Sequence, residues 1–275
     1  MRADLHMHTV YSDGSYSPEE LARRCKQAGL QLISMTDHDN MGGLKEKREA
    51  AEKYGLQFVS GWEISSYDGC KVHVLGYGCR DGELYEKFLE ERRAGALVRA
   101  DDMRKKANAY FGLSVTMDEI ERERLKKNAP LHTMHVVRAF ATKISRRAGE
   151  TYLEYFDFGK PAYSDLFRPL PEHAIDIVHA LGGVAVLAHP GRIRLSFGER
   201  ESLMSRLADY GLDGIECTYT THTLKETEYL KAFAKKRGLF ETGGSDFHTD
   251  DHVHLPGNPV YFADERFLSA IGIPS

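Results

Sequence analysis

The chain has 275 residues and a mass of 31.0 kDa, enough for one large domain or for one domain with an insertion. Its 37 basic and 41 acidic side chains leave a formal net charge of −4, so no long-range positive field would hold duplex nucleic acid. The longest apolar run, at residues 180–188, is far shorter than the roughly 20 residues of a membrane-spanning helix, and no leader-like segment follows Met1, so we expect a cytoplasmic protein without a membrane partner.

Short apolar runs typical of strands alternate with helical segments in the first part of the chain. In chain order we expect a strand at 3–5, a helix from Pro18, a strand at 32–35, a helix near 42–54, and strand-like runs at 57–59, 62–64 and 71–75. Ser17 is a candidate helix N-cap with Pro18 in the first helical position, and Gly29 marks the end of that helix. This alternation favours a parallel barrel or sheet.

The middle of the chain has a different composition. Residues 81–163 are charged, helix-prone and nearly free of strand-like runs, and we interpret the charge blocks at 90–93 and 122–127 as solvated helix faces. Afterwards we expect strands at 183–188, 214–217 and 239–242, and helices at 199–210 and 224–237. We therefore predict an α/β fold in which residues 1–80 and 164–275 form a barrel and residues 81–163 form a helical insertion.

Histidines and acidic residues gather where the predicted strands end. Of the 13 histidines, His6 and His8 close the first strand, and side chains two residues apart on a strand point to the same face. Asp13 follows in a loop, and the other candidates lie at or near later strand ends: His38, Glu63, His73, His189, Asp246 and His248. Because the C-terminal ends of parallel barrel strands open on one rim, we expect these side chains to converge there.

These nine nitrogen and oxygen donors are more than one metal ion needs. One ion with four or five ligands would leave about half of them unused, whereas two or three clustered ions sharing a carboxylate would use nearly all. We therefore predict a multinuclear site. The set contains no cysteine, which favours Mn²⁺, Zn²⁺, Fe²⁺ or Mg²⁺. The four cysteines form no CxxC pair, and we expect them to be reduced core residues.

Taken in order, these motifs resemble those of the polymerase and histidinol phosphatase (PHP) family. They are His6-x-His8 with Asp13, Thr36-Asp37-His38-Asp39, Glu63, His73, Ala188-His189-Pro190-Gly191 and Gly244-Ser245-Asp246-Phe247-His248. The resemblance implies a distorted (β/α)7 barrel with a trinuclear centre that hydrolyses phosphate esters of small metabolites or nucleotides. It also implies the ligand sets: His6, His8, Glu63 and Asp246 for one ion; Glu63, His73 and His189 for a second; Asp13, His38 and His248 for a third.

The insertion resembles that of the family branch that hydrolyses nucleotides and small phosphates. The similarity lies in residues 131–140 and 159–163, and His135 matches the insertion histidine of that branch. Thr133 and Met134 stand where that branch commonly has Arg-Pro. The implied partner is a small phosphorylated metabolite or nucleotide in a pocket capped by the insertion.

The predicted mechanism is hydrolysis by a hydroxide held between two ions that Glu63 bridges, while a third ion neutralises phosphoryl oxygens. Glu63 and Asp246 are the expected catalytic carboxylates, and His222 is a candidate for protonating the leaving oxygen. Candidate phosphate-binding residues on rim loops or in the insertion are His135, Arg138, Lys160, Arg192 and His222. Such a site could cleave a diester and then the resulting monoester.

Two other functional classes stay open. An amidohydrolase-type C–N hydrolase also uses a histidine-rich barrel rim, and the ligand set of Asp13, His38 and His248 distinguishes the two classes. A non-catalytic regulatory PHP domain from a polymerase would come with nucleic-acid-binding modules, which the length and charge do not indicate. His252 and His254 follow the last barrel strand, and we interpret them as surface or lid residues. No oligomeric interface is predicted from the scattered apolar residues.

Overall fold

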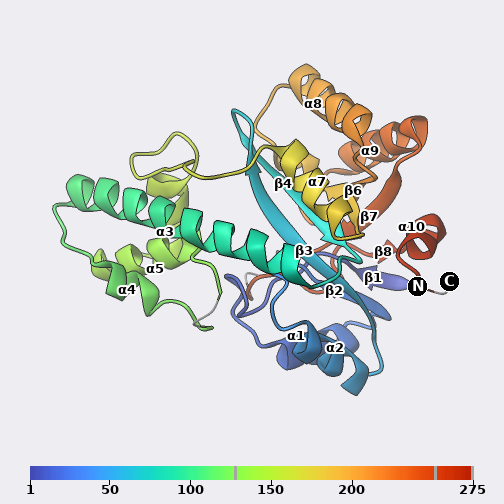
Figure 1. Cartoon of the computed structure of the whole chain (residues 1–275), viewed down its shortest axis with the longest axis horizontal. Coiled ribbons are helices and arrows are strands. Elements are labelled where there is room, and N and C mark those ends of the chain that lie inside the picture. Colours follow the sequence, from blue (N-terminus) through green and yellow to red (C-terminus); the bar gives the residue numbers. More distant parts are fainter. Residues whose placement is uncertain (127–128, 251–252, 274–275) are drawn as a thin grey trace.

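The computed structural model describes residues 1–126, 129–250 and 253–273, and a ring of strands surrounded by helices forms its centre (Figure 1). The strands are β1 Arg2–Asp4, β2 Leu32–Met35, β3 Gln57–Tyr67, β4 Lys71–Tyr77, β5 Val184–Leu187, β6 Gly214–Tyr219, β7 Phe240–Gly244 and β8 Tyr261–Phe262. The helices are α1 Pro18–Gln27, α2 Leu44–Lys53, α3 Glu83–Phe111, α4 Met117–Glu121, α5 Thr133–Lys143, α6 Ala148–Thr151, α7 Pro171–Ala180, α8 Phe197–Tyr210, α9 Leu224–Arg237 and α10 Glu265–Ala270, with a π-helical turn η1 at Tyr152–Phe156 and a 3₁₀ turn η2 at Pro190–Arg192.

The strands follow one another around a nearly closed barrel in the order β7-β6-β5-β4-β3-β2-β1-β8. The ring closes between β7 and β1, where the Leu5 N–H donates to the Gly243 carbonyl at 3.1 Å and the Asp246 N–H donates to the His6 carbonyl at 2.7 Å. A Cβ atom on Gly244 would lie 2.4 Å from the Cβ of His6, so glycine lets the two segments approach. The predicted fold class, a distorted (β/α)7 barrel with a helical insertion, is confirmed.

Two strands depart from the expected parallel order. β8 pairs antiparallel with β1, and β4 pairs antiparallel with both of its neighbours, β3 and β5. β3 and β4 form a hairpin whose turn contains Gly69 at φ +65°, a conformation that glycine adopts readily. Because β4 is reversed, its first residues lie at the rim where the parallel strands end. His73, the third residue of β4, therefore reaches that rim.

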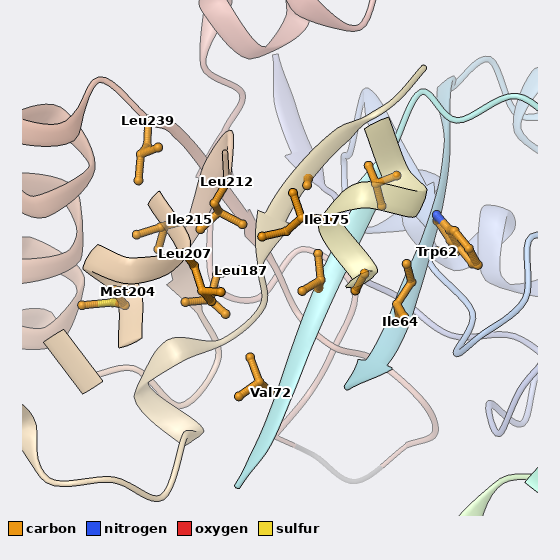
Figure 2. Close-up of a cluster of buried hydrophobic side chains, with 14 of the residues drawn as sticks. Trp62, Ile64, Val72, Ile175, Leu187, Met204, Leu207, Leu212, Ile215 and Leu239 are labelled. Atoms are coloured by element: carbon orange, nitrogen blue, oxygen red, sulfur yellow. The ribbon is translucent and has the colours of Figure 1, made fainter. Parts of the chain in front are cut away.

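The local signals for the first helix are confirmed. The Ser17 hydroxyl accepts the N–H of Glu20 at 3.2 Å, and Pro18 is the first residue of α1. Figure 2 shows how the barrel strands and outer helices share a hydrophobic cluster, in which Ile64 and Leu187 from strands meet Ile175 from α7. The four cysteines are free and buried, as predicted.

The insertion begins with the long helix α3, which runs away from the barrel toward α4 and α5 (Figure 1). Near its start, Phe88 packs in the barrel cluster, whereas Met103 further along packs with Phe140 of α5 and Phe156 of η1 in a separate cluster. These helices thus have apolar packing of their own, and α3 contributes to both this cluster and the barrel cluster. Among the described helices, none combines the length and the apolar character needed to cross a bilayer.

Candidate metal centre

The structure brings the nine predicted ligands together at one end of the barrel, around the buried carboxylate of Glu63 on β3. Glu63 Oε2 lies 3.1 Å from His6 Nε2 and 3.2 Å from His8 Nε2. Asp246 Oδ1 lies 3.3 Å and 3.1 Å from the same two nitrogen atoms. Two imidazoles and two carboxylates therefore point at one position from the segment after β1, from β3 and from the segment after β7.

The other oxygen of Glu63 faces a second pair of imidazoles. Glu63 Oε1 lies 2.7 Å from His73 Nδ1 and 3.0 Å from His189 Nε2. His38 Nδ1 lies 3.1 Å from Glu63 Oε2. One carboxylate thus contacts imidazoles on both sides, which is the arrangement that a bridging ligand requires.

A third group lies around Asp13. Asp13 Oδ1 is 3.3 Å from His248 Nε2 and 4.0 Å from His8 Nδ1. The rings of His8 and His248 stack with centroids 3.9 Å apart, and the His38 ring lies 4.5 Å from that of His8. This group therefore adjoins the first one through His8.

The donor atoms fit divalent cations. Five of them are buried and make no hydrogen bond within the described residues: His6 Nε2, His8 Nε2, Asp13 Oδ1, His38 Nδ1 and Glu63 Oε2. Buried polar atoms without a partner are costly, so such a concentration indicates a ligand. Three sets have all their donor atoms within 4.8 Å of one another: His8, Asp13, His38 and His248; His6, His8, Glu63 and Asp246; His38, Glu63 and His73. Relative to the sets implied by the resemblance, His8 also joins the Asp13 set. His38 stays in that set and also stands with Glu63 and His73, where the resemblance implies His189, whose Nε2 lies 3.0 Å from Glu63 Oε1.

The electrostatics of the cluster also favour bound positive charge. Burial alone would raise the pKa of Glu63, but the neighbouring imidazoles, chiefly His38 and His6, hold that pKa well below its usual range. Burial alone would lower the pKa of His8, but the carboxylates of Asp246 and Glu63, 3.1 Å and 3.2 Å from its Nε2, outweigh this and raise it to about 10. The carboxylates thus stay ionised and attract cations strongly.

A buried carboxylate outside the predicted set supports the cluster. Glu216, on β6, places Oε1 3.0 Å from His6 Nδ1, and its Oε2 accepts the His189 N–H at 2.7 Å. A carboxylate on the far nitrogen of an imidazole fixes the ring orientation, which leaves His6 Nε2 directed at Glu63. The sequence signal that could have identified Glu216 is its place as an acidic residue inside the otherwise apolar predicted strand at 214–217.

Asp37, which directly precedes His38, also supports the cluster without being a candidate ligand. Its carboxylate pairs with Lys47 Nζ at 2.6 Å, and both side chains are fully buried. It also accepts the Thr9 N–H at 2.7 Å and the Ser12 hydroxyl at 2.6 Å. These contacts fix the loop that leads from His8 to Asp13.

A cavity of about 420 Å³ opens over the cluster. Seven of the predicted ligands line it: Asp13, His38, Glu63, His73, His189, Asp246 and His248. Its walls carry the cations Lys71, Arg99, Arg138, Arg168, Arg192 and Arg194, together with His132, Met134, Tyr152, Leu153 and Phe158 of the insertion. The cavity therefore joins a histidine and carboxylate floor to basic walls.

Comparison with known proteins places the chain in a family. The sequence profile of the PHP domain matches residues 4–242, most of the chain. The chain belongs to the PHP domain family. As a PHP protein, it is 33% identical over 258 residues to the phosphoribosyl 1,2-cyclic phosphate 1,2-diphosphodiesterase of Eggerthella lenta, a match that covers 90% of this chain and 94% of the relative.

Other similar proteins are named for different reactions. The 3',5'-nucleoside bisphosphate phosphatase of Chromobacterium violaceum is 32% identical, with 89% of this chain and 86% of that protein covered. The 5'-3' exoribonuclease Rnm of Escherichia coli is 31% identical, with 89% and 84% covered. Among solved structures, an amidohydrolase from Chromobacterium violaceum with bound sulfate and no metal superimposes with a TM-score of 0.86 at 28% identity over 98% of this chain and 97% of that one.

Two of the predicted phosphate-binding residues line the PHP cavity. Arg192 donates to the Tyr219 hydroxyl at 2.8 Å and to Asp246 Oδ2 at 3.1 Å. Arg138, from α5, donates to the backbone carbonyl of Asp13 at 2.8 Å. Both guanidinium groups therefore lie beside candidate ligands.

His222 occupies a different position from the one that a proton donor needs. Its Nδ1 lies 3.0 Å from the Cys217 carbonyl, and its Nε2 accepts the Gly191 N–H at 3.1 Å. Both ring nitrogens are thus engaged with backbone, and the side chain is outside the cavity lining. His222 holds the loop that follows His189.

The remaining two candidates also lie outside the lining. His135 is buried, and its Nδ1 accepts the His132 N–H at 2.9 Å, while Lys160 is exposed. His132, which sequence reasoning did not select, lines the cavity instead. His254 also lines the cavity, and His252 lies outside the described residues.

Proposed function

We propose that this protein is a metal-dependent phosphoesterase that hydrolyses phosphate esters of a small metabolite or nucleotide. The supporting observation is the juxtaposition of overlapping groups of donor atoms, five of them buried without a hydrogen-bond partner among the described residues, with a cavity whose walls carry six cationic side chains. The relatives named as a cyclic phosphate phosphodiesterase, a bisphosphate phosphatase and an exoribonuclease support the same reaction class.

We infer that the centre takes two or three divalent ions, with Mn²⁺, Zn²⁺ or Fe²⁺ favoured by the imidazole-rich donors and Mg²⁺ as a further candidate. Glu63 would be shared between groups, and Asp246 would complete the group of His6 and His8. Bound ions of this kind supply hydroxide near neutral pH and neutralise phosphoryl oxygens. Arg192 lies beside Asp246, where its guanidinium can bind a phosphoryl oxygen and stabilise the developing charge.

The basic wall supports a substrate with a second anionic group. Arg99 is buried, and burial together with the charge of Arg168 lowers its pKa to about 9, which indicates an excess of positive charge at this wall. Nearby, Asp157 pairs with Lys71 at 3.1 Å and with Arg194. A phosphate or carboxylate on the substrate would balance the remaining charge. A phosphoribosyl cyclic phosphate and a nucleoside bisphosphate are the substrates named for two relatives.

We further propose that residues 81–163 are the insertion that caps the cavity and that the protein handles both diesters and monoesters. The cavity volume of about 420 Å³ suits a small ligand, while the exoribonuclease relatives make an RNA end a substrate to be tested. The amidohydrolase named among the solved structures makes C–N hydrolysis the competing reaction.

The test combines elemental analysis of purified protein with hydrolysis of a substrate panel. Wild type, Asp13→Ala and Glu63→Ala would be compared, with the exposed Glu228→Ala on α9 as the control. The panel holds monoesters, bisphosphates, small cyclic phosphates, a short RNA and an amide. We expect two to three ions per wild-type chain and a parallel fall of bound metal and phosphate release in both cluster variants. Unchanged hydrolysis in Glu63→Ala, or hydrolysis of the amide alone, would contradict the proposal.

A further inference from the structure

The helix α5 begins at the cavity. Thr133 and Met134, its first two residues, line the cavity together with His132, which precedes them. The first N–H groups of an α-helix have no intrahelical partner and carry partial positive charge, so this end of α5 favours an anion. Neither Thr133 nor Met134 contributes a charge of its own.

A second, independent observation is the state of the His132 side chain. His132 is 7% exposed, lines the cavity, and its Nε2 makes no hydrogen bond within the described residues. Its ring lies 5.2 Å from that of His38, a member of the Asp13 group. A buried imidazole nitrogen without a partner is costly, so this atom indicates a missing hydrogen-bonding ligand.

Two neighbours in α5 fix this arrangement. The ring nitrogen Nδ1 of His135 accepts the backbone N–H of His132 at 2.9 Å. The backbone N–H of His135 donates to the His132 carbonyl at 3.0 Å. Arg138 donates to the Asp13 carbonyl at 2.8 Å, which ties α5 to the loop that carries a candidate ligand. His132 is therefore held rigidly at the edge of the metal cluster, and the predicted candidate His135 acts by positioning it.

We propose that His132, the N-terminus of α5 and Arg138 form an oxyanion subsite that binds a non-bridging oxygen of the phosphoryl group over the Asp13, His38 and His248 group. The proposal rests on the proposed phosphoesterase function and assigns to the insertion a direct contact with the reacting group. His132 donates from Nε2, while the helix N-terminus and Arg138 add positive potential. The ligand class is a tetrahedral phosphate, either as substrate ester or as product.

The test measures binding of inorganic phosphate, the reaction product, to the Mn²⁺-loaded protein by calorimetry. We expect His132→Ala to raise the phosphate Kd roughly tenfold, the loss expected for one hydrogen bond to a charged group, and to raise KM for a phosphate monoester. The number of bound ions should stay at the wild-type value. His132→Gln keeps a side-chain N–H donor and should recover part of the affinity. The exposed His173→Ala is the matched control and should bind phosphate like wild type.

The outcomes separate this inference from the proposed function. Wild-type phosphate affinity in His132→Ala, in an enzyme that hydrolyses phosphate esters, overturns the subsite and leaves the proposed function intact. Loss of an ion in His132→Ala also overturns it, because His132 is then a metal ligand. A wild-type protein that neither binds phosphate nor releases it from any ester overturns both.

Discussion

Two candidate ligands are held in backbone conformations that residues other than glycine rarely adopt. His189 has φ +29° and Asp246 has φ +56°. Such strain persists only where the surroundings impose it. Here the His189 N–H donates to buried Glu216 at 2.7 Å, and the Asp246 N–H donates to the His6 carbonyl at 2.7 Å. At the residue scale, the centre therefore depends on a few contacts that are not ligands themselves.

The closure of the barrel between β7 and β1 provides a direct test of this dependence. In Gly244→Ala, the added Cβ would lie 2.5 Å from the His6 backbone nitrogen, so the His6 segment has to shift. We expect the free energy of unfolding, measured in urea, to fall by about 2 kcal/mol or more and the metal content to fall with it. In the control Gly198→Ala, the new Cβ meets no atom of the described residues within 4 Å, and stability should stay within about 1 kcal/mol of wild type. Equal stabilities for the two variants would contradict the argument that the close approach of the two segments requires glycine at position 244.

Glu216 should be needed for metal affinity although it is not a candidate ligand. Glu216→Gln keeps the size of the side chain but removes the charge that orients the His6 imidazole, with which Oε1 is in contact at 3.0 Å. We expect metal affinity, measured by competition with a chelating dye, to fall roughly 10- to 100-fold. The exposed Glu228→Gln on α9 should leave it unchanged. A wild-type affinity in Glu216→Gln would show that the packing of β1 alone orients His6.

At the scale of elements, the sequence predicted the strands better than their directions. The alternating pattern around His73 marks a strand but is the same whichever way the strand runs. The direction follows from the link between β3 and β4, where Asp68-Gly69 within a three-residue turn is a hairpin signal. Without that signal, His73 was expected at a strand end, whereas it lies near the beginning of a reversed strand.

Most candidate ligands were predictable because they lie in short local motifs close to the beginning or end of a strand. Glu63 differs from its predicted place at a strand end, because β3 continues past it to Tyr67. The insertion residues were harder to predict because their orientation depends on how α5 packs against the barrel. His132 and His135 are three positions apart at the start of one helix, and the sequence does not decide which faces the cavity. Packing places His135 inside, where it bonds to the backbone of His132. Glu216 was not predicted for a related reason, because its partner His6 is remote in sequence.

The contact between insertion and barrel has a predictable pH dependence. Burial alone would raise the pKa of Asp157, but Lys71, at 3.1 Å, and the Phe158 N–H outweigh this and lower the pKa to about 2. The depressed value means that Asp157 stabilises the folded state above its unfolded pKa of about 4 and loses this contribution as the pH falls toward about 2.

The prediction compares wild type with Asp157→Asn across that range. We expect the variant to be less stable by about 1 to 2 kcal/mol between pH 5 and 7, once solvent screening is allowed for, and the difference to shrink below about pH 4. Urea unfolding at each pH measures it. Asp118→Asn, at an exposed position in α4, is the control. A difference that grows on acidification would reverse the sign of the argument and contradict it.

At the scale of the whole molecule, the candidate centre connects most of the barrel. In chain order the nine donors are His6, His8 and Asp13 after β1, His38 after β2, Glu63 on β3, His73 on β4, His189 after β5, and Asp246 and His248 after β7. Each segment contributes carboxylates or imidazoles that are close together only in the folded chain. Ions that bind this arrangement therefore stabilise the folded state specifically.

Removal of divalent ions should consequently destabilise the whole barrel rather than one loop. A ligand that binds only the folded state adds about 2.7 kcal/mol of stability at a free concentration one hundred times its Kd. We expect a chelator to lower the free energy of unfolding by at least about this amount relative to Mn²⁺-loaded protein, in a single cooperative urea transition. Glu63→Ala lacks the carboxylate that contacts an imidazole on β4 and imidazoles in the segments after β1, β2 and β5, and its stability should depend only weakly on the chelator. If chelation left the transition of wild type unchanged while metal was released, the centre would contribute nothing to holding the strands together, and its burial would have to be explained by catalysis alone.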